Sequence, residues 1–366
     1  MQQKKDQGEE IKGLCSLTPK AHYKAPQGGV TRGKTAPNRL RRVDNFLCLY
    51  DPELLRNGST AAHREACFVD LGYGARPFTT LESARTLRQR LRHPSLLVLG
   101  VEIERKRVRE ALRYADERTL FRVGGFNLPF KPPKEEESLP FVPLVRELRH
   151  AKVIRAFNVL RQYEEAAVRE AFGLLASYLL PGGLLLEGTS DPFGRIWVMN
   201  VMRRPRKAQQ LPQSMEPQHN KQKRKTTAVE YPAWYHAIQP HPSLLSAEAL
   251  VFSTNFKSEE SFDPSQFLGI LPKNHIQHMR EPGQPIHDFM EEWQHCAEDL
   301  IAIRQRYGQR QHFVATAMLL EERGWPVDTS RGRRWLRLGF LILYLQPVIA
   351  RYQQLSSSSS SSSSQS

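Results

Sequence analysis

Short apolar runs and amphipathic stretches alternate along the first half of the chain. Between the apolar runs, hydrophobic residues recur at the i, i+3, i+4 spacing of helices over residues 81–91, 108–115 and 164–179. Strands that alternate with helices at this spacing predict a doubly wound, mostly parallel α/β sheet. The apolar runs that suit strands buried on both faces are residues 66–69, 96–101, 119–123, 152–157 and 184–187.

The second half of the chain predicts a closing pair of strands and then helices. Residues 195–202 and 249–256 favour an antiparallel pair, which brings the sheet to seven strands. The apolar run at residues 336–349 contains Arg337 and Pro347, so it favours a buried helix over a membrane span. The predicted regions are a basic, largely disordered segment 1–45, a main domain 46–257 with a basic insertion at about 203–246, a helical region 258–353, and a disordered poly-Ser tail 354–366.

The net charge of +15 is concentrated in two segments. Residues 1–45 carry ten Lys/Arg against four Asp/Glu, and residues 203–228 carry eight against one. Such segments can attract nucleic acid through its phosphates, or they can simply keep the chain soluble. The sequence leaves both interpretations open.

The sequence shows neither the ligand spacing of a metal site nor the cysteine pattern of a disulfide-bonded protein. The four cysteines are scattered, and no apolar leader or bilayer-length run occurs, which favours a reducing cytoplasm and no membrane. His275, His278 and His287 are not accompanied by Cys or carboxylate at a recognisable ligand spacing, so we expect no metal site.

A glycine turn follows the first predicted strand. Residues 67–74 read Cys-Phe-Val-Asp-Leu-Gly-Tyr-Gly, which indicates a buried strand, an acid at its carboxyl end and two glycines that allow close backbone approach. Thr79 and Glu82 stand at capping-box spacing and predict a helix start just after the turn. A strand, a glycine turn and a helix amino end together suit a nucleotide cofactor.

Two further groups are expected at the same sheet edge. Glu102 ends the second strand, where a carboxylate can accept both hydroxyls of a ribose, although an ordinary strand-end acid is the alternative. Gly125, Phe126 and Asn127 follow the third strand. Phe126 could lie against an adenine ring whose edge is read by Asn127 or a backbone N–H, or it could be a core residue.

The turn itself favours one class of cofactor. A dinucleotide site requires a third glycine where Pro77 stands. Asp70 would repel a pyrophosphate but suits a cationic amino-acid ligand. An NAD(P)-dependent oxidoreductase is therefore disfavoured, although it stays an alternative.

These motifs resemble those of class I S-adenosylmethionine-dependent methyltransferases. Residues 69–74 are similar to the family's first motif, residues 98–102 to its second-strand motif and residues 179–187 to its turn into the fifth strand. The resemblance covers residues 65–200, and more weakly continues to 257. Asp-Leu-Gly-x-Gly-x-x-Pro at 70–77 and Arg-Ala-Phe-Asn-Val-Leu-Arg-Gln-Tyr at 155–163 resemble an uncharacterised bacterial branch of these enzymes.

The resemblance implies a Rossmann-like methyltransferase fold, S-adenosylmethionine as cofactor and transfer of its methyl group. It assigns the methionine end to Asp70, Gly72 and Gly74, the ribose to Glu102, and the border of the adenine to Gly125, Phe126 and Asn127. The chain departs from the family pattern at Arg76, which stands where a third glycine is usual.

The acceptor side of the site is expected at the ends of strands four and five. Asn158 is the best candidate for contact with the acceptor, and a strand-end hydrogen bond is the alternative role for it. The pattern Asn-Pro-Pro-Tyr of amino-group methyltransferases is absent, which disfavours that chemistry. A small molecule, an RNA or a protein remain open as acceptor, and a non-catalytic scaffold or an RNA-binding protein remain alternatives to an enzyme. The other residues expected on this side are Arg161, Tyr163, Glu187 and Asp191.

Overall fold

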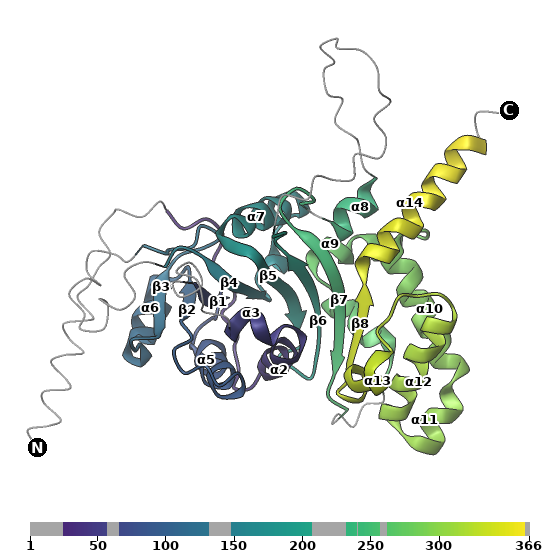
Figure 1. Cartoon of the computed structure of the whole chain (residues 1–366), viewed down its shortest axis with the longest axis horizontal. Coiled ribbons are helices and arrows are strands. Elements are labelled where there is room, and N and C mark those ends of the chain that lie inside the picture. The colour runs from purple at the N-terminus through teal and green to yellow at the C-terminus, as the bar shows by residue number, and fades with distance from the viewer. Residues whose placement is uncertain are drawn as a thin grey trace, which may run out of the picture.

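The computed structural model describes residues 25–56, 66–131, 148–206, 232–239, 241–256 and 262–362. These residues build one sheet with the strand order β3-β2-β1-β4-β5-β6-β7-β8 (Figure 1). The first five strands in that order run parallel, and β6, β7 and β8 are each antiparallel to their neighbours. The strands are β1 (Cys67–Leu71), β2 (Val98–Glu102), β3 (Thr119–Val123), β4 (Ala151–Phe157), β5 (Leu179–Ser190), β6 (Ile196–Arg203), β7 (Ser246–Thr254) and β8 (Phe340–Tyr344).

The predicted doubly wound, mostly parallel and Rossmann-like sheet is confirmed, but the prediction of seven strands is wrong because the sheet has eight. The additional strand, β8, lies inside residues 336–349, which were expected to form one buried helix. That run instead contains the end of α13 (Ser330–Arg337), then β8, then the start of α14 (Leu345–Ser362). A five-residue apolar run has too few positions to distinguish a strand from a helix by periodicity.

Helices cover both faces of the sheet. On the first face, α2 and α5 pack with Phe68, Val153 and Trp197, and on the second face α7 packs with Val69 and Ile154. The first face carries α2 (Arg41–Tyr50), α3 (Pro52–Arg56), α5 (Phe78–Arg90) and α6 (Arg105–Ala111). The second face carries α7 (Glu165–Tyr178), α8 (Ala233–Ile238), α9 (Lys273–Ile276), α10 (Pro285–Asp299), α12 (Gln309–Glu322) and α14, with α11 (Ile301–Tyr307) beside α12.

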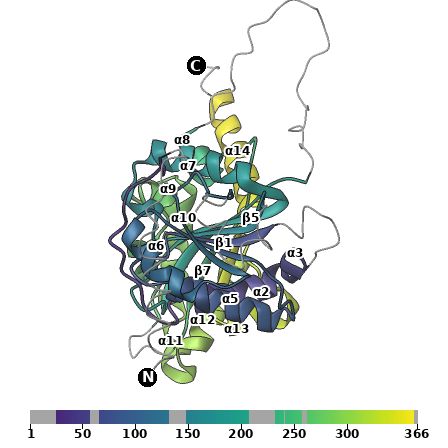
Figure 2. The same ribbon diagram turned by 90° about the vertical axis from the view of Figure 1, so that its left-hand side faces the viewer.

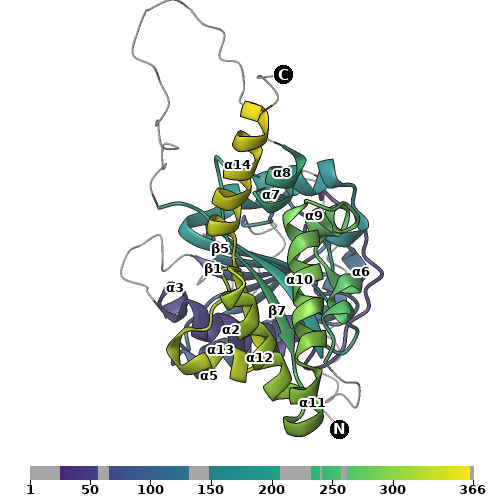
Figure 3. The same ribbon diagram turned by 90° about the vertical axis from the view of Figure 1, so that its right-hand side faces the viewer.

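The carboxyl-terminal helices gather over the antiparallel end of the sheet, as Figures 1 and 3 show. Their centre is Trp293, which is fully buried and stacks on Phe267 at a ring distance of 5.3 Å. The apolar stripe that contains Trp293 is thus part of the core, and α10 and α11 meet at Leu300. Because β8 pairs with β7, the carboxyl-terminal region contributes a strand to the same sheet as the parallel strands.

Parts of both basic segments, residues 1–24 and 207–231, lie outside the described residues, so the nucleic-acid interpretation stays a prediction. Across the part of the chain that the structure describes, every helix is too short or too polar to cross a bilayer. The described cysteines Cys48, Cys67 and Cys296 are buried free thiols.

Candidate functional site

A cavity of about 590 Å³ opens at the carboxyl ends of β1 and β4. The strand order reverses direction between these two strands, which is the usual place for a ligand in an open α/β sheet. Gly72 and Gly74 form part of its wall with φ angles of +74° and +88°, so the turn needs glycine at both positions. None of the described residues in the region 258–353 lines this cavity.

Asp70 lies at the base of the cavity with its carboxylate fully engaged. One oxygen accepts hydrogen bonds from the hydroxyls of Thr79 and Thr80, at 2.8 and 2.7 Å. The other oxygen accepts from the guanidinium of Arg155, whose Nη2 lies 2.9 Å away. Its contact with a methionine ammonium stays a prediction.

The expected capping box at the start of α5 is wrong. No side chain caps this helix, and Pro77 precedes it. Thr79 donates to Asp70 instead, and the carboxylate of Glu82 accepts the backbone N–H of Asn38. Thr79 and Glu82 thus bind residues outside the first turn of the helix, and the Thr-x-x-Glu spacing does not reveal such tertiary contacts.

Arg155 joins Asp70 to a second buried acid. Its Nη1 lies 2.6 Å from Asp44 of α2, and Ser83 donates to the same carboxylate. Burial raises the pKa of Asp44 to about 7, and Arg155 only partly opposes this. Burial alone would lower the pKa of Arg155, but the carboxylates of Asp70 and Asp44 outweigh it and raise that pKa. Arg155 therefore lies between two buried carboxyl groups, and burial is the main cause of the raised pKa of Asp44.

Glu102 is 1% exposed, so no ribose reaches its carboxylate in this conformation. One of its oxygens accepts the backbone N–H of Gly74 at 3.0 Å, and the other accepts that of Ile103 at 2.9 Å. Arg107 of α6 lies 3.4 Å from the second oxygen. The structure thus brings the glycine turn and Glu102 together, as the sequence predicts, and closes the space between them.

An N-terminal strap, defined here as residues 25–35, crosses the sheet edge in front of β1, β2 and β3. Figures 2 and 3 show this purple segment along the outside of the molecule beside α6. The backbone of Gln27 donates to the side-chain oxygen of Asn127 at 2.7 Å and accepts from the N–H of Phe126 at 2.8 Å. Composition favours an unstructured segment here, whereas these contacts hold it on the polar groups expected to read an adenine.

Asn158, in the left-handed region at φ +59°, connects the ends of β4 and β5. Its side-chain oxygen accepts the N–H of Ser190 at 3.0 Å, and its amide donates to the Ser190 hydroxyl at 3.1 Å. Arg39 binds the same hydroxyl at 3.1 Å. Asn158 lines the cavity, so the strand-end hydrogen bond is observed and its contact with an acceptor stays a prediction.

The remaining expected acceptor residues lie in different places, and Asp191 pairs with Arg195 at 3.1 Å outside the cavity lining. Arg161 lines the cavity, and the hydroxyl of Tyr163 bonds to Gly29 of the strap. Glu187 belongs to a separate buried cluster with Asn200, which donates to it at 2.8 Å. His275 also bonds to Asn200, at 2.8 Å. Burial raises the pKa of Glu187 to about 7 and lowers that of His275 to about 3.

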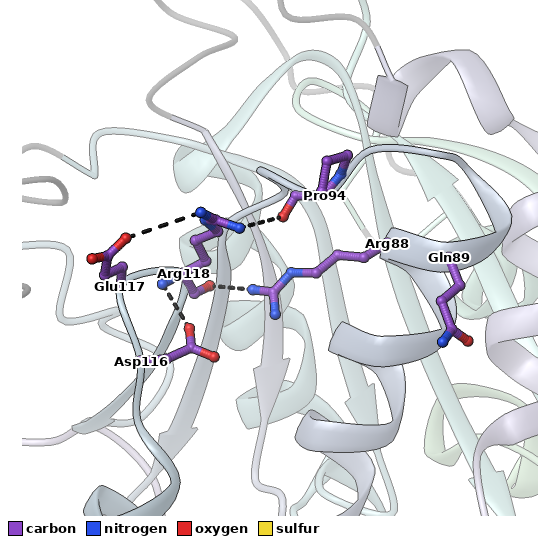
Figure 4. A pocket seen from close by; sticks show the side chains of 6 residues that line it. All are labelled: Arg88, Gln89, Pro94, Asp116, Glu117 and Arg118. Carbon is purple, nitrogen blue, oxygen red and sulfur yellow. Dashed lines mark hydrogen bonds and ion pairs between the residues drawn. The ribbon is translucent and has the colours of Figure 1, made fainter.

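A second hollow, of about 610 Å³, lies at the opposite, amino-terminal edge of β2 and β3 (Figure 4). Its polar groups bind one another, since Arg88 donates to the carbonyl of Arg118 at 2.8 Å and Arg118 donates to that of Pro94. Its position away from the glycine turn gives it no part in the predicted site. Within the described ranges, His, Cys, Asp and Glu form no group of three that could hold a metal.

Arg155 and the strap are the functional features that sequence reasoning missed. An arginine in the middle of the apolar run 152–157 was a usable signal, because a buried cation requires a buried acid. The strap carried no such signal, since its contacts run mainly through backbone groups.

No family model matches this chain, and no curated protein matches it. Solved structures with partial similarity include several methyltransferases and a pericyclic reaction enzyme, which is 14% identical over 38% of this chain and 30% of its own, with a TM-score of 0.27. An S-adenosylmethionine-dependent methyltransferase from Mesorhizobium loti is 18% identical over 34% of this chain and 47% of its own, with a TM-score of 0.24. A putative sarcosine dimethylglycine methyltransferase from Galdieria sulphuraria is 16% identical over 41% and 46%, with a TM-score of 0.28. A putative protein-L-isoaspartate O-methyltransferase from Plasmodium falciparum is 14% identical over 52% and 76%, with a TM-score of 0.26.

The chain spans less than half the length of the first three of these proteins. At such TM-scores, the strand order and the parallel half of the sheet define the fold, and these similarities add nothing to it.

Proposed function

We propose that the protein is an S-adenosylmethionine-dependent methyltransferase whose cofactor binds at the carboxyl edge of β1, β2 and β3. The observation that carries the proposal is the turn at Gly72 and Gly74, which lies where the strand order reverses and lines a cavity whose other wall includes residues 31–35 of the strap. The motif resemblance of residues 69–74 and 98–102 adds the class of cofactor.

Methyl transfer makes modest demands on the protein. The methyl group leaves the sulfonium as the acceptor's electron pair attacks it, so the chain chiefly holds the two reactants in line. Gly72 and Gly74, which carry no side chains, would let the backbone of the turn approach the methionine end closely. Asn158 and Ser190, fixed by their mutual hydrogen bonds, would border the acceptor. The acceptor itself stays open among a small molecule, an RNA and a protein.

Calorimetric titration with S-adenosylmethionine, compared with NADH, tests the proposal. A methyl group added at Gly72 would approach Val159 to 2.6 Å at a φ that disfavours side chains, so Gly72→Ala must shift the turn. We expect this variant to bind at least about tenfold more weakly, equivalent to about 1.4 kcal/mol. Gly308→Ala is the matched control, because Gly308 has a φ of +85° in open space.

Two results would contradict the proposal. Tight NADH binding without S-adenosylmethionine binding would establish an oxidoreductase. Equal affinity of wild type, Gly72→Ala and Gly308→Ala for S-adenosylmethionine would remove the glycine turn from the site.

A non-catalytic scaffold is the second candidate, favoured by the burial of Glu102 and the engagement of its oxygens with Gly74 and Ile103. This candidate predicts no heat of binding for S-adenosylmethionine in any variant, including those that release the strap.

A further inference from the structure

We propose that the strap is an intramolecular ligand of the adenine position, and that it must leave before the cofactor binds. This inference rests on the proposed function. It begins with Gln27, whose backbone N–H and C=O face the Asn127 side chain and the Phe126 N–H.

The backbone of Gln27 offers the same pair of groups as the Watson–Crick edge of adenine. Adenine presents an amino donor beside a ring-nitrogen acceptor on that edge, and proteins read it by hydrogen bonds. Gln27 presents its N–H donor to the Asn127 oxygen and its C=O acceptor to the Phe126 N–H. The two partners are those that the sequence assigns to adenine, so the strap and the base would compete for them.

Steric contact excludes simultaneous occupancy. The carbonyl oxygen of Gln27 would lie only 2.0 Å from a Cβ placed on Gly125, so the strap lies directly against this backbone. At Gly28, a Cβ would lie 3.3 Å from the ring of Phe126. An adenine stacked beside Phe126 therefore needs the space that residues 27 and 28 fill.

The strap also closes the ribose position. Arg107 donates to the carbonyl of Thr31 at 3.1 Å and lies 3.4 Å from Glu102. The carbonyl of Gly33 accepts the N–H of Ala75 at 2.9 Å, beside the glycine turn. Departure of the strap would release Arg107 and the turn together, which gives Glu102 a route to the ribose hydroxyls.

The contacts that hold the strap suit reversible opening. They are hydrogen bonds from an exposed segment, and Val30, its largest apolar residue, is 57% exposed. Segments with few buried apolar contacts open at low free-energy cost. Gly28 and Gly33, with φ of +125° and +68°, provide points about which such a segment can rotate.

The test compares full-length Gly28→Val with wild type. A side chain at Gly28 is disfavoured by its φ of +125° and would meet the Tyr163 hydroxyl at 3.0 Å, so this variant loosens the strap without altering a predicted cofactor contact. Gly283→Val is the matched control, because Gly283 has a φ of +80° with nothing within 4 Å. Calorimetry with S-adenosylhomocysteine measures affinity, and hydrogen–deuterium exchange with mass spectrometry follows peptides that cover residues 25–35 and 120–130.

We expect Gly28→Val to bind about tenfold more tightly than wild type and Gly283→Val to match wild type, since affinity scales with the fraction of open strap. Saturating S-adenosylhomocysteine should accelerate exchange over residues 25–35 and slow it over residues 120–130. This opposite pair of changes is the signature of replacement at one position.

Three results would overturn the inference. Equal affinity of Gly28→Val and wild type would leave the cofactor assignment intact and remove the strap as a competitor. Slower exchange over both peptides would mean that the strap closes over the cofactor. No binding by any of the three proteins, with exchange unchanged, would overturn the proposed function and this inference together.

Discussion

Arg155 in the middle of β4 lies 2.6 Å from Asp44 of α2, and neither side chain is more than 1% exposed. The same guanidinium lies 2.9 Å from Asp70, which leads into the glycine turn. One buried cation thus joins the helix that precedes the sheet to the floor of the candidate site. The position of the Asp70 side chain therefore depends on a buried ion-pair cluster in the core.

Arg155→Met should destabilise the fold by about 3–5 kcal/mol, because it leaves two buried carboxylates without their cation. Chemical denaturation followed by circular dichroism measures the loss. Asp44→Asn in the Arg155→Met background should recover part of it, since one of the stranded charges is removed.

Arg169→Met is the control for this prediction. Arg169 forms a surface pair with Glu165 at 3.7 Å, with 44% of its side chain exposed. Such pairs contribute under about 1 kcal/mol. If both arginine variants lose the same small stability, the Arg155 cluster is not a structural element of the core.

Glu187→Gln should reduce the loss of stability that occurs as the pH rises from 4.5 to about 7. Burial raises the pKa of Glu187 from 4.5 to about 7. The folded state therefore holds a proton that the unfolded state releases between these pH values, and stability falls as pH rises through this window. The glutamine variant should gain stability relative to wild type between pH 5 and pH 8, by at most roughly 3 kcal/mol. An unchanged difference between the two proteins across urea titrations at pH 5 and pH 8 would contradict the raised pKa.

His275 should remain neutral as the solution is acidified. Burial, with a smaller contribution from His278, lowers its pKa from 6.5 to about 3. The stability that this shift contributes is present above pH 6.5 and is lost as pH falls toward 3. NMR of histidine-labelled protein should show at least one ring whose chemical shifts stay constant from pH 7.5 to pH 5, and His275→Phe should remove the signal of one such ring. A His275 ring that titrates near 6.5 would contradict the prediction.

The parallel half of the sheet could be predicted from apolar runs because strands buried on both faces leave a continuous signal. The predicted and observed limits of β3 coincide at Thr119 and Val123. The run 184–187 was too short a prediction, since β5 begins at Leu179 and continues through Pro181 to Ser190. A register shift in the pairing with β4 accommodates that proline, and such a shift depends on the neighbouring strand.

The candidate site was predictable only in its local parts. The turn at Gly72 and Gly74 follows from the sequence because positive φ angles demand glycine there. The partners of Asp70 and Glu102 do not, because they come from α5, β4 and α6 through tertiary contacts. The strap leaves no recognisable sequence pattern, because backbone hydrogen bonds such as those of Gln27 can be made by almost any residue.

Tyr163→Phe should loosen the strap while keeping the ring that packs on Phe126. The Tyr163 hydroxyl donates to the carbonyl of Gly29 at 3.2 Å and also accepts the Gly29 N–H, whereas its ring packs on Phe126 at 5.2 Å. Removal of the hydroxyl should cost the closed strap about 1 kcal/mol, which corresponds to about fivefold more opening. Exchange over residues 25–35 and tryptic cleavage after Arg32 should both accelerate by about that factor.

Tyr50→Phe separates this effect from a general loss of stability. Tyr50 donates to Glu248 at 2.8 Å and makes no contact with the strap, so its variant should exchange residues 25–35 at the wild-type rate. If both tyrosine variants accelerate exchange over the strap equally, global opening controls it. Acceleration in Tyr163→Phe alone would mean that the strap opens as its own unit, which is the behaviour that a competitor for the adenine position requires.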